Sequence, residues 1–179
     1  MSPLSFRRSL LGLATIMLIC GLSVAPSSAQ ASEPELIGTF GDWAAYTFEE
    51  NGNKVCYMAS KPIKAEGNYS RRGDVFALVT HRPVEKSKNV FSYITGYTYK
   101  TNSDVTITLD GNKTFTLFTH KDMAWANTAE DDNALAEALR KGSRFVSKGV
   151  STRGTLTTDT FSLKGSSAAH DAISKACGY

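Results

Sequence analysis

The chain has 179 residues, of which 41% are hydrophobic and 21% charged, and its formal net charge is +3. A single domain of about this length buries roughly two-thirds of the surface that its unfolded chain exposes. Cleavage of the leader described below removes two of the 20 basic residues and none of the 17 acidic ones, which leaves 18 against 17 and a formal charge of +1. Such a balanced surface gives no electrostatic basis for binding nucleic acid or an anionic membrane.

The first 31 residues have the features of a secretory signal peptide. Arg7 and Arg8 give it a positively charged N-terminal part, and a mostly apolar run covers residues 10–24. Residues 29–31 form an A-x-A cleavage pattern. An uncleaved membrane anchor is the alternative, but the apolar run is short for a bilayer span of about 20 residues. We therefore expect a periplasmic or secreted protein without an integral membrane segment after cleavage, and association with the outer membrane stays open.

Residues 32–35 are polar and predict a disordered lead-in to a single domain over residues 36–179. The domain alternates strand patterns with turn signals, of which Asn51-Gly52 is the strongest because both residues tolerate a positive φ. Predicted strands cover residues 43–48, 55–59, 74–81, 90–100, 105–109, 114–119, 144–151 and 155–163, with a short edge piece at 123–125.

Two short helices are predicted late in the chain. Residues 128–141 have an acidic first turn, a basic last turn and Gly142 as a stop signal. Ser166 or Ser167 caps a second helix that ends near Cys177. Regularly spaced strands followed by short helices favour a mainly β fold, an antiparallel β-sandwich with two short α-helices near the C-terminus.

The mature chain has two cysteines, Cys56 and Cys177. In an exported protein they predict one disulfide, which would tie the last helix to the strand at 55–59. Two unpaired buried thiols are the alternative. No metal site is expected, because two cysteines without a nearby histidine cannot complete a tetrahedral shell.

The residues of the chain predict no catalytic constellation and no cofactor. None of the three histidines, His81, His120 and His170, belongs to a pair with metal-ligand spacing. A nucleophile elbow, a phosphate-binding glycine loop and a Ser-x-x-Lys pair are also missing from the sequence. We therefore expect a protein that is not an enzyme.

Two features are candidates for binding a partner. The tripeptide Arg72, Gly73 and Asp74 is the one that integrins read, although a glycine turn before a strand has the same composition.

The second feature is a row of aromatic residues. Tyr93, Tyr97 and Tyr99 fall on one face of the strand predicted at 90–100. They form either a binding platform or ordinary core and cross-strand packing.

Seven segments share a pattern with one known family: FGDW at 40–43, VCY at 55–57, YIT at 93–95, RKGS at 140–143, RGT at 153–155, TDTFSLKG at 158–165 and AA at 168–169. In these segments the chain resembles the invasion-associated locus B family of exported alphaproteobacterial proteins. The resemblance implies a small β-rich envelope or secreted protein without enzymatic activity, and some members are linked to entry into host cells.

From this resemblance we expect a non-enzymatic protein that assists host-cell association. Its partner would be an unidentified protein or envelope component, or a component of the host-cell surface. The alternative is a periplasmic protein that maintains the envelope and has no host role.

Overall fold

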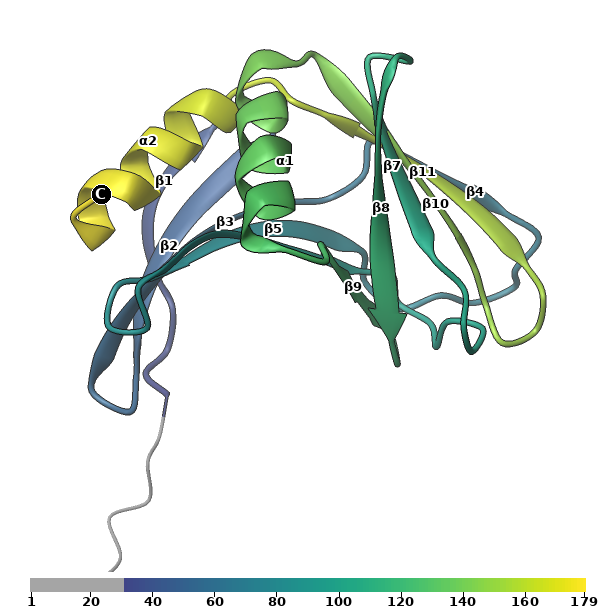
Figure 1. Ribbon diagram of the computed structural model, residues 1–179, viewed down its shortest axis with the longest axis horizontal. Helices are drawn as coiled ribbons and strands as arrows, with labels where there is room; N and C mark the ends of the chain where they lie inside the picture. The colour runs from purple at the N-terminus through teal and green to yellow at the C-terminus, as the bar shows by residue number, and fades with distance from the viewer. Residues whose placement is uncertain (1–30) are drawn as a thin grey trace, which may run out of the picture.

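The structure is a computed structural model that describes residues 31–179. The predicted signal peptide therefore lies outside the described residues, apart from Ala31. The strands are β1 (Glu35–Phe40), β2 (Trp43–Glu50), β3 (Asn53–Ser60), β4 (Lys64–Gly67), β5 (Phe76–Arg82), β6 (Ser87–Ile94), β7 (Val105–Leu109), β8 (Lys113–His120), β9 (Met123–Trp125), β10 (Arg144–Val150) and β11 (Leu156–Ser162). The helices are α1 (Ala129–Lys141) and α2 (Ser166–Cys177). Figure 1 shows their arrangement.

All strands pair antiparallel in the order β1-β2-β3-β5-β6-β9-β8-β7-β10-β11-β4. Strand β8 joins two halves, because its first residues pair with β7 and Phe118–His120 pair with β9. The halves face one another: Phe91 on β6 packs against Phe145 on β10, with ring centroids 6.5 Å apart. The predicted mainly β, antiparallel fold with two helices is therefore confirmed, with the layers formed by one continuous sheet that folds over at β8.

The strands form where apolar residues alternate with polar ones. In β7, Val105, Ile107 and Leu109 are buried, and the two threonines between them are half-buried. In β5, Ala77, Val79 and His81 point inward in the same way. A period of two places one set of side chains in the core between the halves and the other outside.

Helix α1 ends at Lys141 before Gly142 as predicted and begins one residue later than predicted, because Thr128 is its N-cap. The Thr128 hydroxyl accepts the N–H of Asp131 at 3.1 Å, and the N–H of Gly142 bonds to the carbonyl of Ala138. Leu135 and Leu139 are fully buried, and the helix packs against β6.

Helix α2 begins differently from the prediction that Ser166 or Ser167 caps it. Its N-cap is Gly165 at a φ of 89°, and within the part of the chain that the structure describes no side chain caps the helix. A Cβ at Gly165 would overlap the carbonyl of Phe40, so only glycine permits this approach. Ser166 instead donates its hydroxyl to the carbonyl of Leu139 at 2.7 Å, which fastens α2 to α1.

The predicted disulfide is confirmed. Cys56 on β3 bonds to Cys177 at the end of α2, and 121 positions separate them in the sequence. Helix α2 lies across β1, β2, β3 and β5, so the bond fixes the tail of the chain to its first strands (Figure 1). Over residues 31–179, neither helix has the length and apolar character needed to cross a bilayer.

Four details differ from the sequence-based expectation. Strands β1 and β4 were not predicted, because both lie at edges of the sheet, where exposed residues hide any alternation. The lead-in is attached through Ser32, whose N–H bonds to the carbonyl of Glu49 at 2.8 Å. Strand β9 lies between β6 and β8 and not at an edge. The strand predicted at 90–100 is shorter in the structure, because β6 ends at Ile94. The chain that follows is a loop, and Tyr99 pairs with Ser151 in an isolated β-bridge.

Candidate functional site

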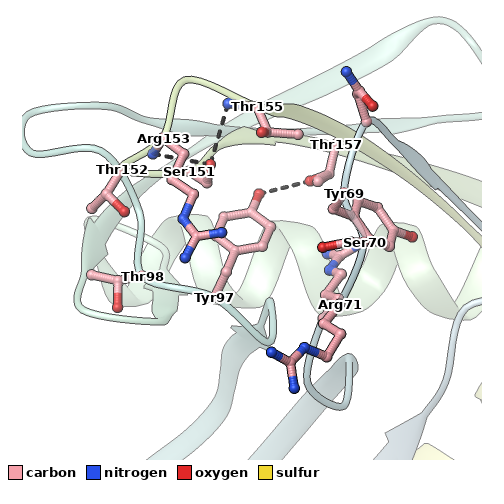
Figure 2. A pocket seen from close by; sticks show the side chains of 12 residues that line it. Tyr69, Ser70, Arg71, Tyr97, Thr98, Ser151, Thr152, Arg153, Thr155 and Thr157 are labelled. Carbon is pink, nitrogen blue, oxygen red and sulfur yellow. Dashed lines mark hydrogen bonds between the residues drawn. The ribbon is translucent and has the colours of Figure 1, made fainter.

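A cavity of about 470 Å³ lies among loops that adjoin β4, β5, β6, β10 and β11. Three segments line it: the loop at 68–72 between β4 and β5, residues 97–98 after β6, and the β10–β11 hairpin at 151–157 (Figure 2). Its volume is in the range of small-molecule sites, which hold roughly 300–1,000 Å³. The segments are far apart in the sequence, and the pairing of β4 with β11 brings the first and the last of them together.

A buried ion pair supports this cavity from below. The Arg72 guanidinium donates to both carboxylate oxygens of Asp159 at 2.6 and 2.7 Å, and the two side chains are 5% and 1% exposed. Arg72 also donates to the carbonyl of Thr95 at 2.7 Å, and the Tyr93 hydroxyl donates to Asp159. A buried pair is stable only when further hydrogen bonds satisfy its remaining groups, and this one has them.

The same contacts change the acidity of the groups. Burial alone would lower the pKa of Arg72, but the hydrogen bonds and the negative charge of Asp159 raise it above its usual value. Burial, followed by the charge of Asp159, raises the pKa of Tyr93. Arg72 therefore stays a cation and Tyr93 stays a neutral donor at all physiological pH values.

The backbones of two loops cross closely next to residues that line the cavity. The N–H of Gly73 bonds to the carbonyl of Gly96 at 2.9 Å. Gly96 has a φ of +73°, and a Cβ there would overlap the carbonyl of Gly73. Glycine is needed at position 96 for both reasons, and the crossing holds the loop before β5 against the loop after β6.

The cavity walls are cationic and rich in hydroxyl groups. Arg71 and Arg153 are exposed, and in Figure 2 Arg153 extends from the hairpin toward the ring of Tyr97 while Arg71 lies on the facing loop. The hydroxyl groups come from Tyr69, Ser70, Tyr97, Thr98, Ser151, Thr152, Thr155 and Thr157. No acidic side chain is among the described residues that line the cavity.

Two hydrogen-bonded contacts shape these walls. The Ser151 hydroxyl accepts the N–H groups of Arg153 at 3.3 Å and Thr155 at 3.2 Å, which fixes the hairpin turn. The hydroxyls of Tyr97 and Thr157 lie 2.7 Å apart. Figure 2 shows both as dashed lines. The cavity is therefore built on ordered elements.

The tripeptide at 72–74 is not presented as one exposed group. The Arg72 side chain is buried in its ion pair with Asp159, and the N–H of Gly73 bonds to the carbonyl of Gly96. Asp74 has an exposed side chain, which pairs with Lys61 at 3.2 Å. A partner that reads this tripeptide would not find its arginine on the surface.

The three tyrosines that the sequence places on one strand face have different surroundings in the structure. Tyr93 and Tyr99 are buried, with 1% and 4% of their surface exposed, and Tyr93 packs against Phe161. Tyr97 is half-buried and lines the cavity. Of the six residues predicted to bind a partner, Arg72 and Tyr97 therefore belong to this site.

The histidines His81 and His170 form a second buried polar cluster, beneath α2. The N–H of Asn89 donates to Nδ1 of His81 at 3.0 Å, so the His81 proton resides on Nε2, 3.1 Å from the Ser174 hydroxyl. That hydroxyl lies 3.4 Å from Nδ1 of His170, whose Nε2 lies 2.7 Å from Oδ1 of Asn89. The four groups thus close a ring of hydrogen bonds, which we call the histidine ring.

The direction of these bonds limits the chemistry of the ring. His81 donates to Ser174 and so cannot take its proton, whereas Nδ1 of His170 lies on the accepting side of that hydroxyl at 3.4 Å. Burial and then the charge of His170 lower the pKa of His81 to about 4, and burial and Arg140 lower that of His170. His120 is exposed at the end of β8. Over residues 31–179, no three His, Cys, Asp or Glu side chains gather as a metal site would require.

A family model described as "Invasion associated locus B (IalB) protein" matches residues 43–174, more than half of the chain. The chain belongs to the invasion-associated locus B family. The family resemblance found in the sequence is thereby confirmed. The matched region of this family member runs from β2 into α2 and includes every residue that lines the cavity. No curated protein and no solved structure is similar enough to the chain to count as a match.

Sequence reasoning did not find Arg71 and Arg153 as members of one site. Each lies in a loop, where an exposed arginine is ordinary, and about 80 residues separate them. The only local signal is the run of turn residues at 151–155, which predicts a hairpin and not a ligand site. Only the pairing of β4 with β11 brings the two loops together.

Proposed function

We propose that this family member is an exported, non-enzymatic protein of the bacterial envelope that acts by binding and assists association with host cells. The disulfide between Cys56 and Cys177 carries the export part of this proposal. Such bonds form and persist in the periplasm and outside the cell and are rare in the cytosol. The leader features of residues 1–31 agree with this compartment.

A binding role is supported by the contrast between the buried histidine ring and the exposed lining of the cavity. His81, His170 and Ser174 bond to one another and to Asn89 within the histidine ring, and burial lowers the pKa of both imidazoles. The cavity, in contrast, combines exposed cations and hydroxyl groups on an ordered scaffold, which suits recognition of a polar ligand.

Export is tested by fractionating cells that make the full-length protein or a variant without residues 2–31. We expect the full-length protein in the periplasm, outer membrane or medium with Cys56 and Cys177 oxidised, as measured by alkylation before and after reduction. The leaderless variant should stay in the cytosol with both thiols free. Full-length protein that remains cytosolic and reduced would refute the proposal.

The host role is tested by deleting the gene and measuring adherence to and entry into cultured host cells, with complementation by the intact gene. We expect adherence or entry to fall and to recover on complementation. Periplasmic maintenance is the second candidate, favoured by the nearly balanced charge of the mature chain. Normal adherence together with raised detergent sensitivity would replace the host role by that one.

A further inference from the structure

The cavity at 68–72, 97–98 and 151–157 has a lining that selects for a class of ligand. Its 470 Å³ are far more than a single inorganic anion needs. Arg72 is neutralised by Asp159, whereas Arg71 and Arg153 form no ion pair with any residue in the described range 31–179. The cavity therefore holds two free positive charges on opposite walls, and its ligand should be an anion of some length.

The remaining lining is suited to sugars. Hydroxyl groups on all three segments can donate to and accept from the hydroxyls of a saccharide. The rings of Tyr69 and Tyr97 lie against the Arg72 guanidinium, with centroids 5.6 and 5.1 Å from its central carbon. This stacking fixes Tyr97 at the cavity, where a ring face can pack against the apolar face of a pyranose.

Other anions fit less well. A nucleic acid needs a string of phosphate contacts, and the nearly balanced surface charge of the mature chain does not supply one. An acidic peptide would be expected to use apolar side-chain pockets or the edge of a sheet, and the lining here is mainly hydroxyl groups and guanidinium groups.

We propose that this cavity binds an acidic saccharide, with Arg71 and Arg153 pairing to its carboxylate or sulfate groups and the threonine and serine hydroxyls bonding to its ring hydroxyls. The proposal deepens the proposed function and rests on its premise of a binding protein. The shared chemistry has two possible sources: a sulfated glycan of a host-cell surface, or a uronic-acid polymer of the bacterial envelope.

The test uses purified mature protein and isothermal titration calorimetry with four probes: a heparin tetrasaccharide, trigalacturonic acid, neutral maltotriose and sodium phosphate. At least one acidic oligosaccharide should bind at one site and more tightly than maltotriose or phosphate, and should shift the amide NMR signals of Thr98, Thr152 and Thr155. Preference for the heparin fragment indicates a host glycan, and preference for trigalacturonic acid indicates the envelope.

Variants separate the cavity from general charge attraction. The double variant Arg71→Gln/Arg153→Gln should lose about tenfold or more in affinity, because it removes two charge-assisted contacts. Both side chains are exposed, so folding should be unaffected. The control Arg144→Gln/Lys175→Gln removes the same charge from exposed positions outside the cavity and should change the affinity less than about threefold.

Several outcomes would overturn the inference: no binding of either acidic probe, equal binding of maltotriose or phosphate, or an equal loss of affinity in the control variant. These failures are distinct from failure of the proposed function. A protein found oxidised in the periplasm that binds none of the probes keeps its proposed export and loses only the saccharide site.

Discussion

Two buried polar clusters within residues 31–179 are stabilised in opposite ways. The histidine ring beneath α2 is neutral, and four groups satisfy one another within it. The second, which we call the arginine cluster, consists of Arg72, Asp159, Tyr93 and Thr95 and carries a full ion pair. Neutral groups can be sealed under a helix once their hydrogen bonds close, whereas a buried ion pair must have every remaining group satisfied.

The surroundings of the clusters differ accordingly. The histidine ring lies next to the disulfide, with Sγ of Cys177 3.9 Å from the carbonyl of His81. The arginine cluster lies beneath a cavity that opens to solvent. One region closes the fold and the other supports the cavity that we propose as a binding site, so disrupting each should give different results.

The largest effect is expected from the disulfide. Removing it in a Cys56→Ala/Cys177→Ala variant should lower the free energy of unfolding by about 4–5 kcal/mol, because the chain-entropy model assigns this to a closed loop of roughly 120 residues. Urea denaturation measures it. Reduced wild-type protein is the matched control and should lose a similar amount; an unchanged midpoint in either sample would show that α2 is held by packing alone.

Breaking the arginine cluster comes next. Arg72→Ala should destabilise the protein by about 3–5 kcal/mol, since Asp159 would be left as an uncompensated buried charge. Lys61→Ala, which breaks the exposed pair with Asp74, is the control and should cost at most about 1 kcal/mol.

A double variant tests the ionic character of this cluster. Arg72→Met/Asp159→Asn should be less destabilised in urea than the sum of its single changes, because it leaves no unpaired charge. Strict additivity would mean that the two side chains contribute independently.

Acid should act on the histidine ring. The pKa of His81 is lowered to about 4 in the fold against an ordinary value of 6.5, so the unfolded state takes up the proton first as the pH falls. The stability that neutral His81 contributes is complete above pH 6.5 and is lost toward pH 4, by about 2 kcal/mol at pH 5.

Measuring this effect needs a variant, because Asp132 opposes it. Burial raises the pKa of Asp132 to about 6, so protonation of Asp132 favours the fold as the pH falls. Between pH 7.5 and 5, His81→Gln should therefore lose about 2 kcal/mol less stability than the wild type. Parallel stability curves for the two proteins would show that His81 is not kept neutral by the fold.

The smallest effect concerns the backbone crossing of Gly73 and Gly96 beside the cavity. Gly96→Ala and Gly111→Ala both force a non-glycine residue to a positive φ, +73° and +78°. Only at Gly96 would the new Cβ also meet backbone, that of Gly73, whereas nothing lies within 4 Å of a Cβ at Gly111. Gly96→Ala should therefore be less stable than its control by about 1 kcal/mol in thermal unfolding; equal losses would place the crossing outside the stable core.

Much of the fold was predictable because its signals are local. The alternation in 105–109 and the hairpin turns predicted strands that the structure contains, and Thr128 and Gly142 end α1 as expected. The edge strands β1 and β4 were missed since their exposed residues need no alternation. The prediction that Ser166 caps α2 is wrong, because its hydroxyl donates to the carbonyl of Leu139 on α1, a contact that the local sequence does not show.

The candidate site was less predictable for a physical reason. The sequence marks Arg72 and Tyr97 as candidate binding residues, with a glycine turn and core packing as the alternatives. Arg72 is buried by Asp159, 87 positions away, and Tyr97 lines the cavity in the loop that follows the end of β6 at Ile94. A cavity lined by three separate segments has no period and no fixed spacing, so neither pattern nor composition reveals it.

The amino-acid sequence by itself determined the mainly β class, the two helices, the family and the pairing of Cys56 with Cys177, because each follows from short-range patterns or from counting. Tertiary structure alone decided that one arginine of a neighbouring pair is buried while Arg71 and Arg153 face a common cavity. Charge burial depends on which partner the fold delivers, and that partner lies far away in the chain.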